Sequence, residues 1–427
     1  MGRIKIMVRH SYLSCLLLAI LISGCTFHHL EKELTEYEAS FGLIGKIEET
    51  VPGTGPVVVA LYQKVDAGTT VIQYLIVDST RHYSFIVGEG VYYIAAFEDT
   101  NNNLIYDEGE TYGQFGKPDE VTVDAQAMAS AGTKSRNALD ITLKQKSGYP
   151  AGMRRNVVEG SLAARSFKKV GVVAALDDEI FDQENGALGY WKPLSFLKEI
   201  GIGIFFLEPY DPDKIPVLFV HGASGTPVGW KPMVAKLDGQ RYQPWFYYYP
   251  SGLELDSIAK ALNILVKELH TEHRFNRLHV VAHSMGGLVS RAFIIKNMAE
   301  DQQSYIETFV SLSTPWGGVS TAALGVKYAP IVVPNWHDVS PDSEFLQHMY
   351  EDLLPDEVKF YLLFGVHGEC SMVMANNDGT VEIASEIDYR AQADATGFYG
   401  FNENHTSILT SDRVIDRVLE LIDAGGQ

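Results

Sequence analysis

Ser284 lies in a run of small residues between two segments of predicted regular structure. Residues 278–282 are apolar enough for a buried strand, and residues 285–298 have the pattern of an apolar helix. The turn between them reads Ala282-His283-Ser284-Met285-Gly286, with a small residue two positions away on each side. A tight strand-to-helix turn needs small neighbours there and projects its serine hydroxyl at the end of a sheet. The pattern therefore predicts that Ser284 is a nucleophile.

A serine nucleophile needs a histidine as base and an acid that orients the histidine. In strand–turn–helix sites of this kind the chain order is serine, acid, histidine. Asp378, in the run Asn-Asn-Asp-Gly-Thr-Val, follows a predicted strand at 358–364, and His405 lies shortly before a predicted last helix at 413–422. We predict that Asp378 orients His405, which takes the Ser284 proton and returns it to the leaving group.

Other residues could fill these roles. Asp338 is a rival acid, and the Asp378-Gly379 pair could be an ordinary turn. The rival bases His348 and His367 do not have the chain position expected of the histidine. His221 precedes the serine, so we interpret it as an organiser of its loop.

Negative charge that develops on a substrate carbonyl needs hydrogen-bond donors. The backbone N–H of Met285 comes directly after the nucleophile, at the start of the predicted helix. A second donor is expected from the loop that follows the apolar strand at 215–220, where the chain reads His-Gly-Ala-Ser-Gly. Within that loop we select the N–H of Ala223.

Together these segments resemble the α/β-hydrolase superfamily over about residues 210–427. The turn around Ser284 is similar to its nucleophile elbow, usually G-x-S-x-G, with Ala282 in place of the first glycine. His221-Gly222 resembles the oxyanion motif of lipases and esterases, and the Asp378 segment resembles their D-G-x-V segment. The run 313–318 (Ser-Thr-Pro-Trp-Gly-Gly) resembles the S-T-P-x-G-G segment of bacterial lipases, PGAP-like deacylases and lecithin–cholesterol acyltransferase-like enzymes, and 340–346 resembles their P-x-S-x-F-L stretch.

This resemblance implies a serine esterase or lipase that forms an acyl-enzyme and needs no cofactor for catalysis. The substrate class it implies is an acyl ester or lipid, without specifying one compound. An acyltransferase would use the same triad, with an alcohol or amine in place of water. Trp316, Tyr328 and Trp336 lie where such enzymes often carry a cap, and could line an acyl pocket or pack in the core.

The elements that must position these residues indicate two domains. From about residue 210, strands alternate with helices, which predicts an α/β fold with a doubly wound sheet and helices on both faces. We assign residues 150–427 to this domain, with a boundary near 148–156. Residues 41–147 contain short alternating strands separated by turn residues, and predict a β-sandwich. This region resembles prealbumin-like or carboxypeptidase-regulatory-like sandwiches.

One loop of the predicted sandwich has the oxygen spacing of a calcium loop. A structural calcium ion is one interpretation, although Leu104 replaces the usual glycine; a solvated hairpin is the other. The candidate ligands, with Ile105 contributing its carbonyl, are Asp99, Asn101, Asn103, Ile105, Asp107 and Glu110.

The first 25 residues resemble a bacterial lipoprotein signal. A basic start precedes the apolar run 12–22, which is too short to span a bilayer, and Ile22-Ser23-Gly24-Cys25 is similar to a lipobox. The resemblance implies removal of residues 1–24 and a lipid on Cys25, followed by a tether at 25–40. An ordinary signal peptide and a short amphiphilic anchor are the alternatives. Thr26 favours the outer membrane of a bacterial cell envelope as the location.

Composition limits the remaining functions. The net charge is −20, which disfavours a nucleic acid partner because phosphate binding needs clustered basic residues. Of three cysteines only Cys370 would remain unmodified after processing, so no intrachain disulfide is expected. A surface-binding protein with an inactive hydrolase domain is the competing class. The oligomeric state is not indicated.

Overall fold

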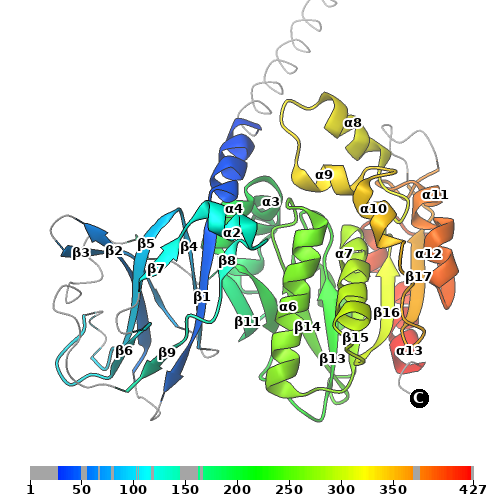
Figure 1. Cartoon of the computed structure of the whole chain (residues 1–427). Helices are drawn as coiled ribbons and strands as arrows, with labels where there is room; N and C mark the ends of the chain where they lie inside the picture. The colour runs from blue at the N-terminus through cyan, green and yellow to red at the C-terminus, as the bar shows by residue number, and fades with distance from the viewer. Residues whose placement is uncertain are drawn as a thin grey trace, which may run out of the picture.

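The computed structural model describes residues 27–49, 55–65, 68–77, 81–101, 103, 105–116, 120–144, 162–163, 167–368 and 376–424. The predicted signal at 1–24, Cys25, Leu104, Cys370 and the domain boundary near 148–156 lie outside the described residues. Figure 1 shows an all-β body beside a larger body in which helices cover a sheet. In the described part of the chain, no helix is long and apolar enough to cross a membrane.

The larger body contains one eight-stranded sheet in the order β11-β12-β14-β13-β15-β16-β17-β18. Six of its strands, from β13 to β18, run parallel, whereas β11 and β12 run antiparallel to them. The predicted α/β class is confirmed, and the sheet is mixed because its first two strands run against the others. The strands are β11 (Lys168–Val173), β12 (Ile202–Phe206), β13 (Ile215–Val220), β14 (Tyr242–Tyr248), β15 (Leu278–His283), β16 (Ile306–Leu312), β17 (Lys359–Gly365) and β18 (Gly397–Phe401).

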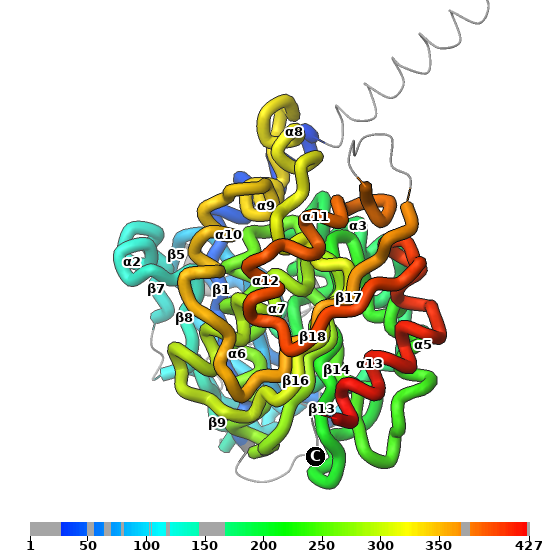
Figure 2. Tube along the Cα trace, turned by 90° about the vertical axis from the view of Figure 1, so that its right-hand side faces the viewer, coloured from blue at the N-terminus to red at the C-terminus, as the bar shows by residue number. Residues whose placement is uncertain are grey.

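Helices cover both faces of this sheet, and each face has its own apolar core. Helix α6 (Leu255–His273) buries one stripe of apolar residues, and α7 (Met285–Ile294) is buried along its whole length. Both pack against one face, whereas α5 (Lys231–Val234) and α13 (Asp412–Ala424) pack against the other. Figure 2 shows α6 on one side of the strands and α13 and α5 on the other.

Shorter helices connect these elements. Residues 227–234 form a 3-10 turn, η3 (Pro227–Trp230), followed by α5, and the helix after Ser284 changes beyond Ile294 into the π-helical segment η4 (Ile295–Glu300). Three helices at one end of the sheet form a cap region: α8 (Ser320–Tyr328), α9 (Pro334–Val339) and α10 (Glu344–Met349) (Figure 1). The others are η2 (Glu179–Phe181), α3 (Gln183–Trp191), α4 (Pro193–Glu199), α11 (Ile383–Glu386), α12 (Tyr389–Asp394) and η5 (Ser407–Leu409).

The smaller body is a sandwich of two sheets around one apolar core. One sheet has the order β4-β1-β8, with β9 paired to β1, and the other has the order β10-β3-β2-β5-β6, with β7 paired to β5. Its elements are β1 (Phe41–Glu49), β2 (Val57–Val65), β3 (Gly68–Ile76), β4 (His82–Val87), β5 (Gly90–Glu98), β6 (Tyr112–Gln114), β7 (Val121–Val123), α2 (Ala125–Ser130), β8 (Ser135–Arg136), β9 (Ile141–Leu143) and β10 (Leu162–Ala163).

Several contacts join other parts of the chain to the α/β body. Residues 27–38, expected to be part of a tether, form a helix in which Glu33 accepts hydrogen bonds from the Ser195 backbone N–H (2.9 Å) and hydroxyl (2.5 Å). From the sandwich, His82 pairs with Glu268 of α6, which also pairs with Lys168. The helix at 27–38 is therefore docked on the α/β body.

Candidate active site

Ser284 occupies a strained turn between β15 and α7. Its φ is 54° and its ψ is −132°, a conformation that non-glycine residues rarely adopt outside functional sites. Two glycines allow the close packing of this turn. A Cβ on Gly286 would lie 2.4 Å from the His221 carbonyl oxygen, and one on Gly287 would lie 2.0 Å from Thr314 Oγ1. The strand-to-helix turn thus holds Ser284 at the carboxyl end of the parallel strands.

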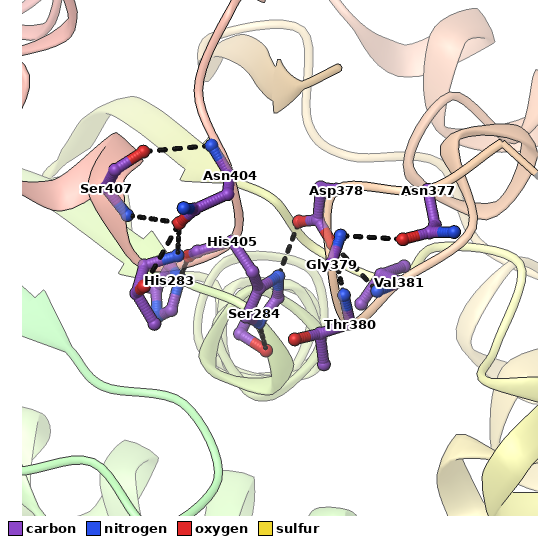
Figure 3. Close-up of polar contacts among 11 residues, drawn as sticks. His283, Ser284, Asn377, Asp378, Gly379, Thr380, Val381, Asn404, His405 and Ser407 are labelled. Carbon is purple, nitrogen blue, oxygen red and sulfur yellow. Dashed lines mark hydrogen bonds and ion pairs between the residues drawn. The ribbon is translucent and has the colours of Figure 1, made fainter. Parts of the chain in front are cut away.

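Ser284, His405 and Asp378 form one chain of hydrogen bonds (Figure 3). The His405 Nε2 atom lies 2.9 Å from Ser284 Oγ, and Nδ1 lies 2.6 Å from Asp378 Oδ2. All three side chains are buried, at 9%, 8% and 0% exposure for Ser284, His405 and Asp378. A histidine bonded in this way can remove the hydroxyl proton, while the carboxylate orients the ring and stabilises its charged form.

The loop that carries Asp378 holds its carboxyl group as a carboxylate. The other oxygen, Oδ1, accepts hydrogen bonds from the backbone N–H groups of Thr380 (2.9 Å) and Val381 (2.8 Å). Burial by itself would raise the Asp378 pKa, but hydrogen bonds and the positive charge of His405 hold it well below its ordinary value. Asn377 accepts a hydrogen bond from the Gly379 N–H (2.8 Å) and closes the same turn.

The loop that carries His405 is fixed by two side chains. Asn404 Oδ1 accepts hydrogen bonds from the N–H groups of Thr406 (3.0 Å) and Ser407 (2.8 Å). The His283 Nε2 atom lies 2.7 Å from the His405 carbonyl oxygen, to which only a protonated ring nitrogen can donate. Burial, then the neighbouring His405, lower the His283 pKa to about 3, so this ring is neutral near pH 7. His283 therefore holds the backbone of His405 in position through this hydrogen bond.

The loop after β13 lies directly against Ser284. A Cβ on Gly222 would be 2.7 Å from Ser284 Cβ and 3.3 Å from Ser284 Oγ, so only glycine fits. This contact brings the next residue, Ala223, to the nucleophile, while Met285 begins α7 on the other side. The loop is held by the Tyr249 hydroxyl, which donates to the His221 carbonyl oxygen (2.5 Å). The segments that carry Ala223 and Met285 therefore adjoin Ser284 on two sides.

His221 is buried in this loop as an uncharged ring. Its ring stacks on Tyr249 with centroids 4.2 Å apart, and its Nδ1 atom lies 2.7 Å from the Gly222 carbonyl oxygen. Burial lowers its pKa to about 4. These contacts stabilise the conformation of the loop after β13.

The rival residues lie apart from the hydrogen-bonded chain. Asp338 accepts a hydrogen bond from the Leu255 N–H (2.7 Å) at the start of α6, which stabilises that helix terminus. His348 pairs with Glu351 on the exposed side of α10, and the His367 side chain is exposed. Neither histidine has an observed contact with Ser284.

The three aromatic residues considered for an acyl pocket have different surroundings. Trp316 is fully buried and packs edge-on against Phe360 in the core of the sheet. Trp336 contacts Trp191 and donates a hydrogen bond to the Tyr190 hydroxyl (2.6 Å). Tyr328 is 70% exposed at the end of α8. Trp316 therefore stabilises the core.

The candidate calcium loop is closed by its own side chains. The amide nitrogens of Asn101 and Asn103 both approach Asp107 Oδ2, at 2.6 and 2.8 Å. Glu110 accepts hydrogen bonds from the N–H groups of Thr100 (2.8 Å) and Asp107 (2.9 Å). The amide oxygens of Asn101 and Asn103 accept hydrogen bonds from the backbone N–H groups of Asn103 (3.2 Å) and Ile105 (2.8 Å), so both amides present their nitrogen atoms to Asp107.

Two residues near the triad were missed in the sequence. His283 lies inside the nucleophile motif, and its position beside Ser284 was the available signal. Glu386, at the end of α11, is fully buried next to Asp378. No pattern in the sequence marks Glu386, because its proximity to Asp378 depends on how α11 docks.

Sequence comparison finds similarity around the nucleophile. A family model described as lecithin:cholesterol acyltransferase matches residues 251–329, a segment that contains Ser284 but neither Asp378 nor His405. Phosphatidylcholine-sterol acyltransferase of Gallus gallus is 37% identical over 57 residues, which is 13% of this chain and 14% of that protein. The chain thus matches only a small part of that curated relative.

Structural comparison finds several solved structures. A lipase of Bacillus licheniformis in its mature form is 20% identical, with 51% of this chain and 97% of that chain covered and a TM-score of 0.43. A protein of Listeria innocua is 15% identical, with 49% and 94% covered and a TM-score of 0.39. A phospholipase of Legionella pneumophila is 18% identical, with 40% and 44% covered and a TM-score of 0.33.

Proposed function

We propose that this chain is a membrane-anchored serine hydrolase that cleaves carboxylic acyl esters of the lipase or esterase type. The observation that carries the proposal is the hydrogen-bonded chain from Asp378 through His405 to Ser284 Oγ. Ser284 stands in the strained turn that exposes a nucleophile at the end of a sheet. A structural serine would not require this combination of backbone strain, base and acid.

The reaction follows from this geometry. His405 Nε2 takes the proton as Ser284 Oγ bonds to the ester carbonyl carbon, and the N–H groups of Ala223 and Met285 receive the negative oxygen. When the ester bond breaks, His405 gives the proton to the leaving alcohol. Water then attacks the acyl-enzyme, His405 again accepts and returns a proton, and the acid is released.

Ester hydrolysis by wild type and Ser284→Ala tests the proposal. With p-nitrophenyl esters from short to long acyl chains, we expect the variant to lose at least about 10³-fold in kcat. Ser290→Ala is a matched control, because Ser290 is buried in α7, six residues after Ser284. Equal rates for wild type and Ser284→Ala would refute the mechanism, and the chain-length profile separates an esterase from a lipase.

Acyl transfer is the second candidate function. It is favoured by the match of residues 251–329, around Ser284, to the lecithin:cholesterol acyltransferase family model. In a transferase an acceptor alcohol replaces water at the acyl-enzyme. Product analysis with a phospholipid donor, with and without a sterol or another alcohol, distinguishes the two: a transferase forms a new ester, whereas a hydrolase releases free acid in both cases.

The competing proposal is a binding lipoprotein whose hydrolase domain is inactive. A fluorophosphonate probe, which reacts with an activated serine, distinguishes this protein from an active hydrolase. Labelling of wild type but not Ser284→Ala supports an activated nucleophile. If wild type is not labelled, the binding protein is favoured.

Anchoring through a lipid on Cys25, in the outer membrane of a bacterial cell envelope, is part of the proposal. Phe27, two residues after Cys25, lies against Trp191, which contacts Trp336 of the cap region. A lipid on Cys25 would thus hold the cap side near the membrane. Cys25→Ala should release the protein into the aqueous fraction and abolish labelling by a palmitate analogue. A variant that remains in the membrane fraction would contradict anchoring through this residue.

A further inference from the structure

A second carboxyl group lies behind the acid of the triad. Glu386 is the last residue of α11 and is fully buried. One oxygen of Glu386, one oxygen of Asp378 and a ring nitrogen of His405 all lie within 4.8 Å of one another. The mechanism above assigns no role to Glu386, although it is one of the nearest ionisable groups to the Asp378–His405 pair.

The position of Glu386 beside Asp378 is set by the way α11 packs against the segment after β16. Ser385, the residue before Glu386, donates from its hydroxyl to the Gly318 carbonyl oxygen (2.6 Å). Its own carbonyl oxygen accepts from the Gly317 N–H (3.1 Å). These bonds fasten α11 to the segment 313–318 that follows β16, so the hydrogen bonds of Ser385, through its hydroxyl and its backbone, hold Glu386 beside Asp378.

The surroundings of Glu386 do not support a second negative charge. Asp378, the Ser313 hydroxyl and the Gly365 backbone N–H are near its carboxyl group, yet neither carboxyl oxygen receives a hydrogen bond of ordinary geometry from the described residues. Burial first, and then the charge of Asp378, raise the Glu386 pKa to about 10. Asp378, in contrast, has two N–H donors and His405. Of two adjacent carboxyl groups, Asp378 is therefore the one that ionises.

We propose that Glu386 is a protonated positioning residue, whose carboxylic acid O–H donates a hydrogen bond to Asp378 and fixes that carboxylate against His405. This role rests on the proposed function, because it acts through the triad. The donated bond also withdraws part of the Asp378 charge from His405, which destabilises the imidazolium. Removal of the donor should therefore raise the pH at which the base loses its proton.

Among the described residues, few titratable groups lie close to Glu386. Asp378 and His405 face Glu386 directly, and His283, whose pKa is lowered to about 3 by burial, lies beside His405 with ring centroids 4.9 Å apart. His221, also buried and uncharged near pH 7, lies near His283. The Asp388–Arg390 pair on α12 is balanced in charge. Changes in the acid limb of the pH profile upon substitution of Glu386 can then be assigned to the Asp378–His405 pair.

Three variants test the proposal in the full chain. Glu386→Gln keeps the shape, the neutral charge and an N–H donor, and should retain kcat within about threefold with an unchanged acid limb of kcat/KM. Glu386→Met removes the donor and should lower kcat about tenfold, with little change in KM, and move the acid limb up by about one pH unit, the equivalent of one charge-assisted hydrogen bond. Glu382→Met, at the residue directly before α11 and four positions from Glu386, is the matched control and should leave the acid limb unchanged.

An equal loss of kcat in Glu386→Gln and Glu386→Met would overturn the proposal and indicate a packing role. An unchanged acid limb of kcat/KM in Glu386→Met would do the same. Infrared difference spectra of wild type against Glu386→Gln at pH 7 give a test independent of activity and of the folding of the Met variant. The band of a protonated carboxyl group should be present in wild type only, and its absence there also overturns the proposal. Failure of the proposed function is distinguishable, because Ser284 of wild type would then resist fluorophosphonate labelling whatever the spectrum shows.

Discussion

Gly222 and Ser284 are in direct contact, although they are 62 positions apart along the chain. A Cβ at position 222 would lie 2.7 Å from Ser284 Cβ, a distance that real side chains do not adopt. The loop after β13 and the turn that carries Ser284 can therefore pack this closely only because residue 222 has no side chain. This contact brings the loop that carries Ala223, the proposed oxyanion donor, next to Ser284.

Gly222→Ala should impair catalysis more than stability. The added methyl group must displace the loop or Ser284, and a shift of this size in a positioned group costs about 10²-fold in kcat. Gly239→Ala is the matched control, because a Cβ there would meet no atom within 4 Å. Ester hydrolysis and melting temperatures of the three proteins check the prediction. Wild-type kcat in Gly222→Ala would show that the loop does not position the oxyanion.

Asp378→Asn should lower kcat by about 10³- to 10⁴-fold while the protein stays folded. The amide cannot hold His405 in the tautomer that leaves Nε2 free to accept a proton, and cannot stabilise the imidazolium. Asp338→Asn tests the rival acid and should leave kcat within about threefold of wild type. Steady-state kinetics of both variants decide between the two acids: a large loss in Asp338→Asn with little loss in Asp378→Asn would reverse the assignment.

Glu268→Gln should weaken the contact between the sandwich and the α/β body at neutral pH. Burial opposes ionisation of Glu268, but His82 and Lys168 together lower its pKa to about 2. A depressed carboxyl pKa contributes stability above its unfolded value of about 4.3, and that stability is lost as the pH falls toward 2. We expect the variant to be less stable by about 2 kcal/mol at pH 7 and to approach wild type near pH 2.

Thermal unfolding between pH 7 and pH 2 measures this difference. Glu272→Gln, an exposed position on the same helix α6, is the control and should follow wild type throughout. A constant difference between wild type and Glu268→Gln at all pH values would contradict the electrostatic explanation.

Calcium should stabilise the loop at 99–110. Binding to the folded state only raises the melting temperature with ligand concentration, so we expect calcium to raise that of the full chain and a chelator to reverse the effect. Glu110→Gln should abolish the response, whereas Glu108→Gln, an exposed neighbour outside the candidate ligands, should keep it. An unchanged melting temperature of wild type in calcium would favour the solvated hairpin.

The local sequence around Ser284 specified much of the fold and of the site. Apolar strands followed by turns predict the carboxyl ends of parallel strands, and the small residues at 282, 286 and 287 predict the tight turn, because larger side chains would collide there. The chain order of this fold predicted that Asp378 and His405 lie downstream of Ser284. In the structure, Asp378 is within hydrogen-bond distance of His405, and His405 is within hydrogen-bond distance of Ser284. Periodicity is a local property, and it identified most of the strands and helices of the α/β body.

Long-range packing decided the rest. The antiparallel direction of β11 and β12 depends on which strands become neighbours in the sheet. The core position of Trp316 depends on its packing against Phe309 of β16 and Phe360 of β17. The docking of residues 27–38 through Glu33 and Ser195 joins segments 162 residues apart. Glu386 is the clearest case: an isolated glutamate in a short helix acquires its protonation state only from burial beside Asp378, and burial is a property of the folded chain.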